Sequence, residues 1–171
     1  ALRAPDSVLV SGTESPGDGG HPAPFLAWST DLGATWARTS FPARADRTLR
    51  IAQVDPDEPE TAYLRVTGGA SDQLAIATDG GARVEVALDL GAPMSAFVKA
   101  SDGSLYVGTR TGRLWRRAPG QGFDAGPGPQ FRCLGERGGV LYACGDDQLD
   151  GFAVGVSHDQ GAHFSPLLRI E

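Results

Sequence analysis

The sequence predicts an all-β protein assembled from four copies of one unit of about forty residues. Its 24 glycines and 12 prolines are spread along 171 residues between short apolar runs, which is typical of short strands joined by turns. A hairpin corner recurs along the chain, and its closing residues fall at positions 36, 84, 123 and 164. The steps of 48, 39 and 41 residues match the length of a four-stranded blade, so we expect a segment of a β-propeller.

The corner is clearest in two stretches, "STDLGATW" at 29–36 and "SHDQGAHF" at 157–164. Their shared positions are Ser29, Asp31, Gly33 and Trp36 in the first and Ser157, Asp159, Gly161 and Phe164 in the second. A weaker copy at 77–84 keeps Asp79 and Gly81, and a fourth at 116–123 keeps only a glycine and Phe123. These copies predict a turn between the third and fourth strands of each blade.

The residue types at the corner suit a self-closing turn. An Asp carboxylate can accept hydrogen bonds from backbone amides one to three residues further on. A glycine adopts a positive φ at little cost. We expect the closing aromatic side chain to tuck under the hairpin and bury about 200 Å².

These corners follow the pattern S-x-D-x-G-x-x-W, and the pattern resembles the Asp-box, or BNR, motif. The chain is therefore similar to the Asp-box propellers of the sialidase and sortilin-like group, which also includes certain xyloglucanases and photosystem II assembly factors. The resemblance covers nearly the whole chain and implies a secreted bacterial member. It also implies structural corner residues, because the box lies away from the binding face in that family.

Strands are expected in four groups, from which blades at about 7–41, 48–90, 94–126 and 130–171 follow. The first group comprises 8–11, 25–28 and 36–41; the second 49–54, 62–67, 74–77 and 84–88; the third 95–100, 105–108, 113–115 and a poor strand near Phe123; the fourth 131–134, 140–144, 152–156 and 164–170. The first blade lacks its innermost strand. We therefore expect 1–171 to be a single segment of an incomplete ring, completed by the remaining blades of a longer propeller or by a second chain.

The two cysteines, Cys133 and Cys144, bracket a hairpin whose turn centres on Gly138-Gly139. This register places them directly opposite each other, within disulfide distance. A bridge over so short a loop would stabilise the fold by about 2–3 kcal/mol at most. A reduced buried pair and a metal site are the alternatives. A disulfide would indicate a secreted, periplasmic or cell-surface protein.

Bulk properties exclude two classes of partner. The formal net charge of −6 and the pI near 5.0 disfavour nucleic acid, which requires a basic surface. The sequence contains no apolar run of 18 residues, so we expect no membrane span.

Candidate binding residues gather on loops that join second to third strands. The long loop at 12–24 is expected to share a face with the acidic loops of the other blades. The residues predicted to bind a ligand on this face are Glu14, Asp18, His21, Asp72, Asp146, Asp147 and Asp150. The acidic loop 144–152 could hold calcium, but it lacks the D-x-D-x-D-G spacing, so we expect no metal or cofactor.

Three functions remain open. The first is a non-enzymatic module that binds a protein or a glycan. The second is a fragment of a sialidase- or xyloglucanase-like glycoside hydrolase whose catalytic groups lie outside this chain, and the third is a purely structural repeat. No catalytic residue is assigned. Arg65, Arg110 and Arg132 could converge on a carboxylate, but we interpret them as surface or ion-paired. The tyrosines Tyr63, Tyr106 and Tyr142 are expected in the core. The arginines of 110–117 are expected on an exposed strand face.

Overall fold

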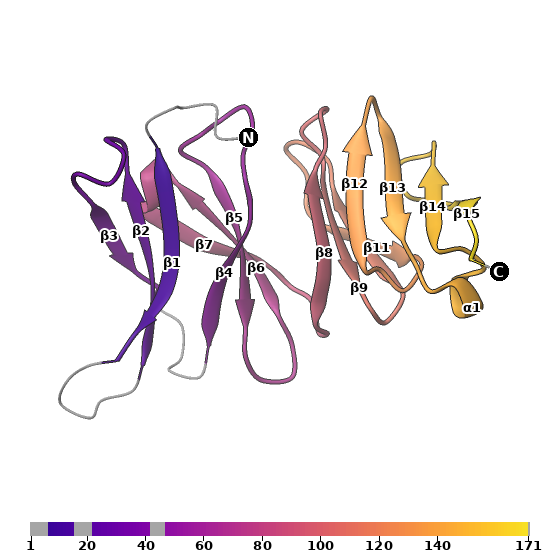
Figure 1. The fold of residues 1–171 in the computed structure, drawn as a ribbon, viewed down its shortest axis with the longest axis horizontal. Helices are drawn as coiled ribbons and strands as arrows, with labels where there is room; N and C mark the ends of the chain where they lie inside the picture. The colour runs from indigo at the N-terminus through magenta and orange to yellow at the C-terminus, as the bar shows by residue number, and fades with distance from the viewer. Residues whose placement is uncertain (1–6, 16–21, 42–46, 171) are drawn as a thin grey trace. The chain divides into compact units, whose positions relative to one another are not determined.

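The computed structural model describes residues 7–15, 22–41 and 47–170. In these residues the fold is all-β, with four separate antiparallel sheets of three or four strands (Figure 1). The chain divides into two compact units, Ala1–Gly91 and Ala92–Glu171, and each unit holds two of the sheets. This arrangement confirms the predicted fold class, an all-β propeller segment.

The first unit holds a three-stranded and a four-stranded sheet. The order of the first sheet is β1 (Val8–Glu14), β2 (Ala23–Ser29) and β3 (Ala37–Ser40). The order of the second is β4 (Thr48–Val54), β5 (Ala62–Thr67), β6 (Gln73–Thr78) and β7 (Arg83–Asp89), with a 3-10 turn, η1 (Asp79–Gly81), between the last two strands.

The second unit repeats this plan with two four-stranded sheets. The first is β8 (Met94–Lys99), β9 (Leu105–Thr109), β10 (Arg113–Arg117) and β11 (Asp124–Pro127). The second is β12 (Cys133–Arg137), β13 (Val140–Cys144), β14 (Val154–Ser157) and β15 (Ser165–Leu168), with a short helix, α1 (Asp147–Asp150), between β13 and β14. In every sheet sequential strands are neighbours.

Two local features differ from the sequence-based expectation. Strand β1 runs through Glu14, which pairs with Ala23, so the first and last residues of the expected loop 12–24 belong to a ladder. The acidic loop after Cys144 contains the helix α1, whose N-cap is Asp146. An Asp N-cap followed by polar residues is a helix-start signal, but a single turn is too short to show a hydrophobic period.

Within each unit the two sheets share a core of alternating apolar residues. In the first unit Leu26 and Trp28 of β2 pack with the fully buried Leu64 and Val66 of β5. In the second unit Phe131 is fully buried, and its ring fills the space where side chains on Gly108 and Gly128 would lie. In the second unit, a large aromatic side chain therefore packs directly on the backbone of two glycines.

The corner glycine is the closest point of this contact. Gly161 has a φ of +88°, and Leu114 of β10 occupies the position that a Cβ on Gly161 would need. In the first unit Gly81 approaches β2 in the same way, with its Cβ position 3.1 Å from Leu26 Cδ2. In each unit, the corner of the second sheet thus lies against the strand of the first sheet that leads into that sheet's own corner, which is β2 in the first unit and β10 in the second.

Replacing Gly161 with Ala should therefore destabilise the fold in two ways. The positive φ costs about 1 kcal/mol, and the clash with Leu114 should add about 1–3 kcal/mol. Gly120→Ala is the matched control, because Gly120 also has a positive φ, +74°, with no atom within 4 Å of its Cβ position. Urea unfolding should show a clearly larger loss for G161A than for G120A. Equal losses would contradict the packing argument.

The predicted disulfide between Cys133 and Cys144 is confirmed, with the two Cα atoms 4.9 Å apart. The two residues are register partners at the start of β12 and the end of β13, as the turn at Gly138-Gly139 requires. The bridge therefore fixes the register of this hairpin covalently.

Removal of this bridge by Cys133→Ser with Cys144→Ser should lower the free energy of unfolding by about 2–3 kcal/mol. Urea unfolding of the wild-type chain should shift by the same amount when a reductant is added. The double variant supplies the control, because reductant should leave its midpoint unchanged. A wild-type midpoint that does not respond to reductant would be inconsistent with the bond.

Candidate functional site

The two well-formed corners share one hydrogen-bonded geometry. In the first, the Ser29 hydroxyl donates to Asp31 at 2.8 Å, and it accepts from the Gly33 amide at 2.7 Å. The Asp31 carboxylate also accepts from the Thr35 amide at 2.8 Å. In the second corner Ser157, Asp159, Gly161 and His163 repeat these three contacts at 2.8, 2.9 and 2.9 Å.

These contacts keep both corner carboxylates ionised. Hydrogen bonds from the Thr35 side chain and backbone, followed by the one from Ser29, lower the pKa of Asp31 to about 2. The backbone and side chain of His163 lower the pKa of Asp159 further still. A carboxylate held in this way accepts hydrogen bonds and cannot act as a general acid near neutral pH, so its geometry suits a structural role.

The two weaker copies close by other contacts. The turn at Asp79–Gly81 is the 3-10 element η1, in which the Ala82 amide donates to the Asp79 carbonyl at 3.1 Å. The Asp79 carboxylate instead forms an exposed ion pair with Arg83. At 116–123 the Gln121 amide donates to the Ala118 carbonyl at 3.0 Å, and the Arg117 guanidinium lies 5.2 Å from the Phe123 ring centroid.

The closing aromatics differ from the prediction that each one tucks under its own hairpin. Phe164 packs edge-to-face on Phe131, with ring centroids 5.8 Å apart, and so joins the core between two sheets. Trp36 is 45% exposed, and its indole N–H donates to the Gly33 carbonyl. Trp36 thus lies against its own corner, but the prediction of a buried ring is wrong for it, because nearly half of the side chain remains exposed.

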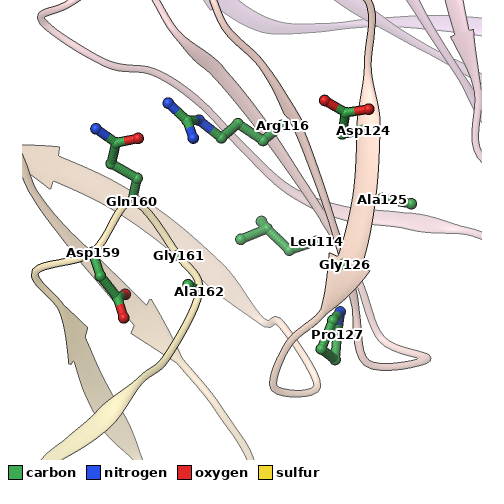
Figure 2. A pocket seen from close by; sticks show the side chains of 10 residues that line it. All are labelled: Leu114, Arg116, Asp124, Ala125, Gly126, Pro127, Asp159, Gln160, Gly161 and Ala162. Atoms are coloured by element: carbon green, nitrogen blue, oxygen red, sulfur yellow. The ribbon is translucent and has the colours of Figure 1, made fainter.

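A pocket of about 330 Å³ lies beside the corner at 157–164 in the second unit (Figure 2). One wall is formed by β10 and the outer strand β11, and the other wall is formed by the corner. The lining residues are Leu114, Arg116, Asp124, Ala125, Gly126, Pro127, Asp159, Gln160, Gly161 and Ala162. The cavity exists because Gly126, the register partner of Leu114, has no side chain to fill the space beside it.

Arg116 supplies the positive charge of this pocket. Its guanidinium lies 6.0 Å from the ring centroid of Tyr106, which is buried on the neighbouring strand β9. Burial raises the pKa of the Tyr106 hydroxyl, so that group stays protonated. Arg116 and Arg117 are half-buried against aromatic rings, and Arg113 and Arg110 are exposed. The expectation of an exposed arginine face therefore fails for Arg116 and Arg117, because their guanidinium groups lie over aromatic rings.

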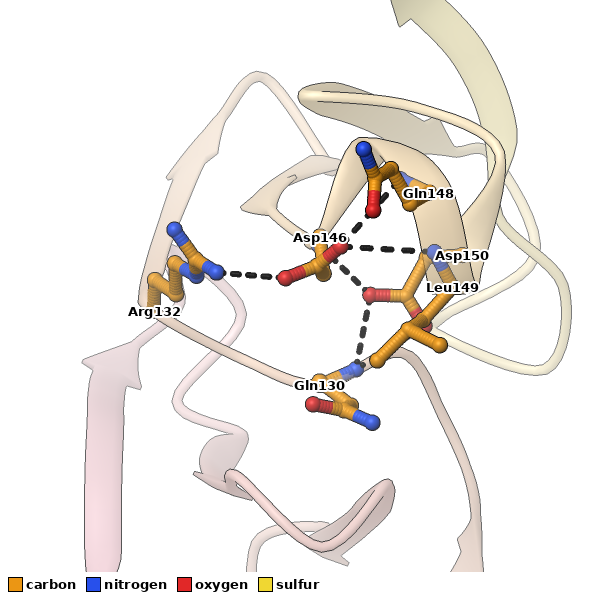
Figure 3. A network of polar contacts seen from close by, with 6 residues as sticks. All are labelled: Gln130, Arg132, Asp146, Gln148, Leu149 and Asp150. Atoms are coloured by element: carbon orange, nitrogen blue, oxygen red, sulfur yellow. Dashed lines mark hydrogen bonds and ion pairs between the residues drawn. The ribbon is translucent and has the colours of Figure 1, made fainter.

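Asp146 is the N-cap of α1, and Asp147 and Asp150 are its first and last residues. Figure 3 shows the polar contacts of Asp146 and Asp150. The Asp146 carboxylate accepts from the amides of Gln148 and Leu149 and pairs with Arg132 at 2.5 Å. The Asp150 carboxylate accepts from the amides of Asp146 at 2.7 Å and Gln130 at 3.1 Å. These two predicted binding residues are thus engaged in shaping their own loop.

The other predicted binding residues lie in the first unit or outside the described residues. Asp72 is buried and pairs with Arg65 at 2.7 Å. Glu14 pairs with Arg38 across the first sheet, and this contact lowers its pKa. Asp18 and His21 lie outside the residues that the structure describes.

The candidate groups for sialidase chemistry also have local partners. Arg65 and Arg132 form the two ion pairs just described. Tyr63 is buried and donates to Asp55 at 2.8 Å, whereas Tyr142 is only half-buried. Over the described part of the chain, no cluster of three or more His, Cys, Asp or Glu side chains could hold a metal ion. No helix among those residues is long and apolar enough to cross a membrane.

No protein-family model and no curated protein matches this sequence. Two solved structures of puromycin hydrolase are similar in fold, each with 21% sequence identity and a TM-score of 0.62. The match to a serine-to-alanine variant in complex with PGG covers 92% of this chain and 28% of that one. The match to puromycin hydrolase itself covers 96% and 29%. The chain therefore spans less than a third of these proteins, and the likeness concerns the fold alone.

Sequence reasoning missed the pocket residues, although a signal for them was present. The strand near Phe123 was predicted to be poor, and its residues Asp124–Pro127 form the wall that leaves the cavity open. A strand with few large side chains, next to a well-formed corner, therefore indicates that the side chains of the two sheets leave a cavity between them. Only Asp159 and Gly161 of the lining belong to the predicted site residues, and they were predicted as structural.

The lowered pKa values of Asp31 and Asp159 predict an acid-sensitive fold. A folded-state pKa below the usual 3.8 contributes stability that is present above about pH 4 and is lost as the pH falls toward 2. The thermal midpoint should therefore fall less between pH 4 and pH 2 for Asp31→Asn with Asp159→Asn than for the wild type. Asp124→Asn, at an exposed carboxylate outside the two corners, should leave the wild-type slope unchanged. Identical slopes for all three proteins would refute this assignment.

Proposed function

We propose that residues 1–171 form one secreted, non-enzymatic propeller segment of the Asp-box kind, which binds a partner protein at the pocket beside Gly161. The observation that carries this proposal is the pocket itself, which is open, largely apolar in its lining and bounded by one arginine. The four-sheet fold and the self-closing Ser-x-Asp-x-Gly corners support the Asp-box assignment.

The lining favours an apolar side chain of a protein over a sugar. Leu114, Pro127 and Ala162 present carbon atoms, and a volume of about 330 Å³ suits one or two side chains. A sugar ring requires several hydrogen-bonding partners in fixed positions, and the two carboxylates and Gln160 lie at only part of the rim (Figure 2). Arg116 can pair with an acidic group next to the apolar anchor.

The state of the carboxylates supports a binding function over a hydrolytic one. A glycosidase needs two carboxyl groups across a cleft, one of them able to hold a proton. Asp72 pairs with Arg65, and Asp150 accepts two backbone amides. Both carboxylates are therefore occupied by contacts that shape local structure.

The disulfide supports a secreted, periplasmic or cell-surface location. A bond between Cys133 and Cys144 forms and persists in an oxidising compartment, and one of the two residues is exposed.

A matched pair of glycine variants tests the pocket. Gly126 lies directly opposite Leu114 in the ladder, so a side chain at 126 would project into the same space. Its Cβ position has no atom within 4 Å, which allows Gly126→Leu to fill the pocket without disturbing the fold. Peptides selected from a displayed random library on the wild type should bind G126L about tenfold more weakly or worse.

Gly122→Leu is the control, because Gly122 has an equally open Cβ position and lies outside the pocket. It should keep wild-type peptide affinity. A glycan array and fluorogenic sialoside and β-glucan substrates, assayed with the same proteins, cover the alternatives. Retention of glycans alone, turnover of a substrate, or equal peptide binding by G126L and the wild type would reject the proposal.

A further inference from the structure

The pocket beside Gly161 borders the outer edge of a sheet. Strand β11 is the last strand of that sheet, and β10 is its one neighbour among the described strands. Asp124, Ala125 and Pro127 of β11 are exposed. The far edge of β11 therefore carries backbone groups that no described strand pairs with.

The register of β10 and β11 identifies these backbone groups. The Gly128 amide donates to the Gly112 carbonyl at 3.0 Å, so these two residues form a hydrogen-bonded pair that continues the ladder. Hydrogen-bonded pairs alternate along an antiparallel ladder, so Gly126 directs its amide and carbonyl toward β10. Ala125 then directs both of its groups to the outer edge. Pro127 has the same orientation and has no N–H to leave unpaired there.

The alternate positions of β11 face the pocket. Gly126 and Asp124 are the register partners of Leu114 and Arg116, so they lie on the face of the sheet that these two pocket residues occupy. Gly126 leaves the space between the outer edge and Leu114 open, since no atom lies within 4 Å of its Cβ position. A large side chain opposite Gly126 on an added strand would lie over this glycine and enter the pocket.

The charge at this edge favours a basic residue two positions from that side chain. Asp124 is exposed and forms no ion pair with a described residue. Its register partner Arg116 extends toward Gln160 of the corner, away from the Asp124 carboxylate (Figure 2). Residues two apart on a strand share a face, so an added residue opposite Asp124 lies beside this carboxylate. A Lys or Arg at that place would form a cross-strand ion pair.

We infer that the partner protein binds through an extended segment that adds an antiparallel strand to the outer edge of β11, with a large apolar side chain opposite Gly126 and a basic one opposite Asp124. The sheet is antiparallel throughout, and this pairing gives the residue opposite Ala125 two backbone hydrogen bonds. Main-chain bonds then supply affinity, and the pocket supplies specificity. The inference rests on the proposed function, because the apolar side chain occupies the same pocket.

N-methyl scanning of peptides that bind the wild type and not G126L tests the added strand. In these peptides the residue between the apolar and the basic position lies opposite Ala125. Methylation of its amide removes one backbone hydrogen bond and places a methyl group against the edge, so binding should weaken about tenfold or more. The amides of its two neighbours point away from β11. Their methylated forms are the matched controls and should bind within about twofold of the parent peptide.

Ala125→Pro removes the same hydrogen bond from the side of the protein. The Ala125 N–H points outward, so the ladder between β10 and β11 should survive the substitution, and urea unfolding verifies this. A125P should bind the peptides about tenfold more weakly or worse. Ala125→Ser is the control, because it keeps the N–H and should retain wild-type affinity.

Asp124→Asn tests the ion pair with the basic side chain. D124N should bind a lysine-containing peptide about threefold more weakly than the wild type does. A version of that peptide with glutamine in place of the lysine should bind both proteins equally.

Three results would overturn the inference: a methyl scan in which the central residue weakens binding no more than its neighbours, an A125P chain that binds as well as A125S, or selected peptides without the basic residue. In each case, loss of binding by G126L would still support the pocket. Peptides that bind G126L as tightly as the wild type would overturn the proposed function together with this inference. The scan itself uses the wild-type protein, so it decides the inference even where A125P does not fold.

Discussion

The fold depends on the approach of a corner backbone to a leucine of another sheet. A Cβ on Gly161 would clash with Leu114, so no side chain fits between them, and Gly81 approaches Leu26 less closely, with its Cβ position at 3.1 Å. The Ser-Asp hydrogen bonds hold the backbone of the clearest corners at the required angle, and the glycine φ makes that angle accessible. The corner thus has two roles. It closes a hairpin, and its glycine backbone provides the surface on which a leucine of the neighbouring sheet packs.

The architecture could be predicted from the sequence because the corner pattern recurs at a nearly constant spacing, which locates strands that a single copy would leave uncertain. Corners about forty residues apart placed the strands of all four sheets, and the turn at Gly138-Gly139 placed Cys133 opposite Cys144. The exposure of Trp36 could not be predicted in this way, since the corner pattern does not say whether the closing aromatic meets a residue of another sheet, as Phe164 meets Phe131, or meets solvent. The engagement of Asp146 and Asp150 within their own loop depends on backbone amides, which leave no trace in a side-chain pattern.

The candidate site arises where the repeat is weakest. The third corner has lost its Ser and Asp, and the strand after it consists of Asp124, Ala125, Gly126 and Pro127. A strand of this kind provides hydrogen bonds to β10 but little volume, so the space next to Leu114 stays open. Repeat proteins can gain a binding surface in this way without inserting a loop, because the loss of side chains from one copy leaves the scaffold of the others intact.

The unequal burial of the tryptophans gives the chain an intrinsic optical probe. Trp28 is 3% exposed within the core of the first unit, whereas Trp36 is 45% exposed in the adjoining corner. Indole emission shifts to shorter wavelength when the ring leaves water, so Trp36 contributes most to the red edge of the fluorescence spectrum, with a smaller share from the third tryptophan, the half-buried Trp115. Quenching by a dissolved anion such as iodide would then register any molecule that settles on that corner, without a label being attached.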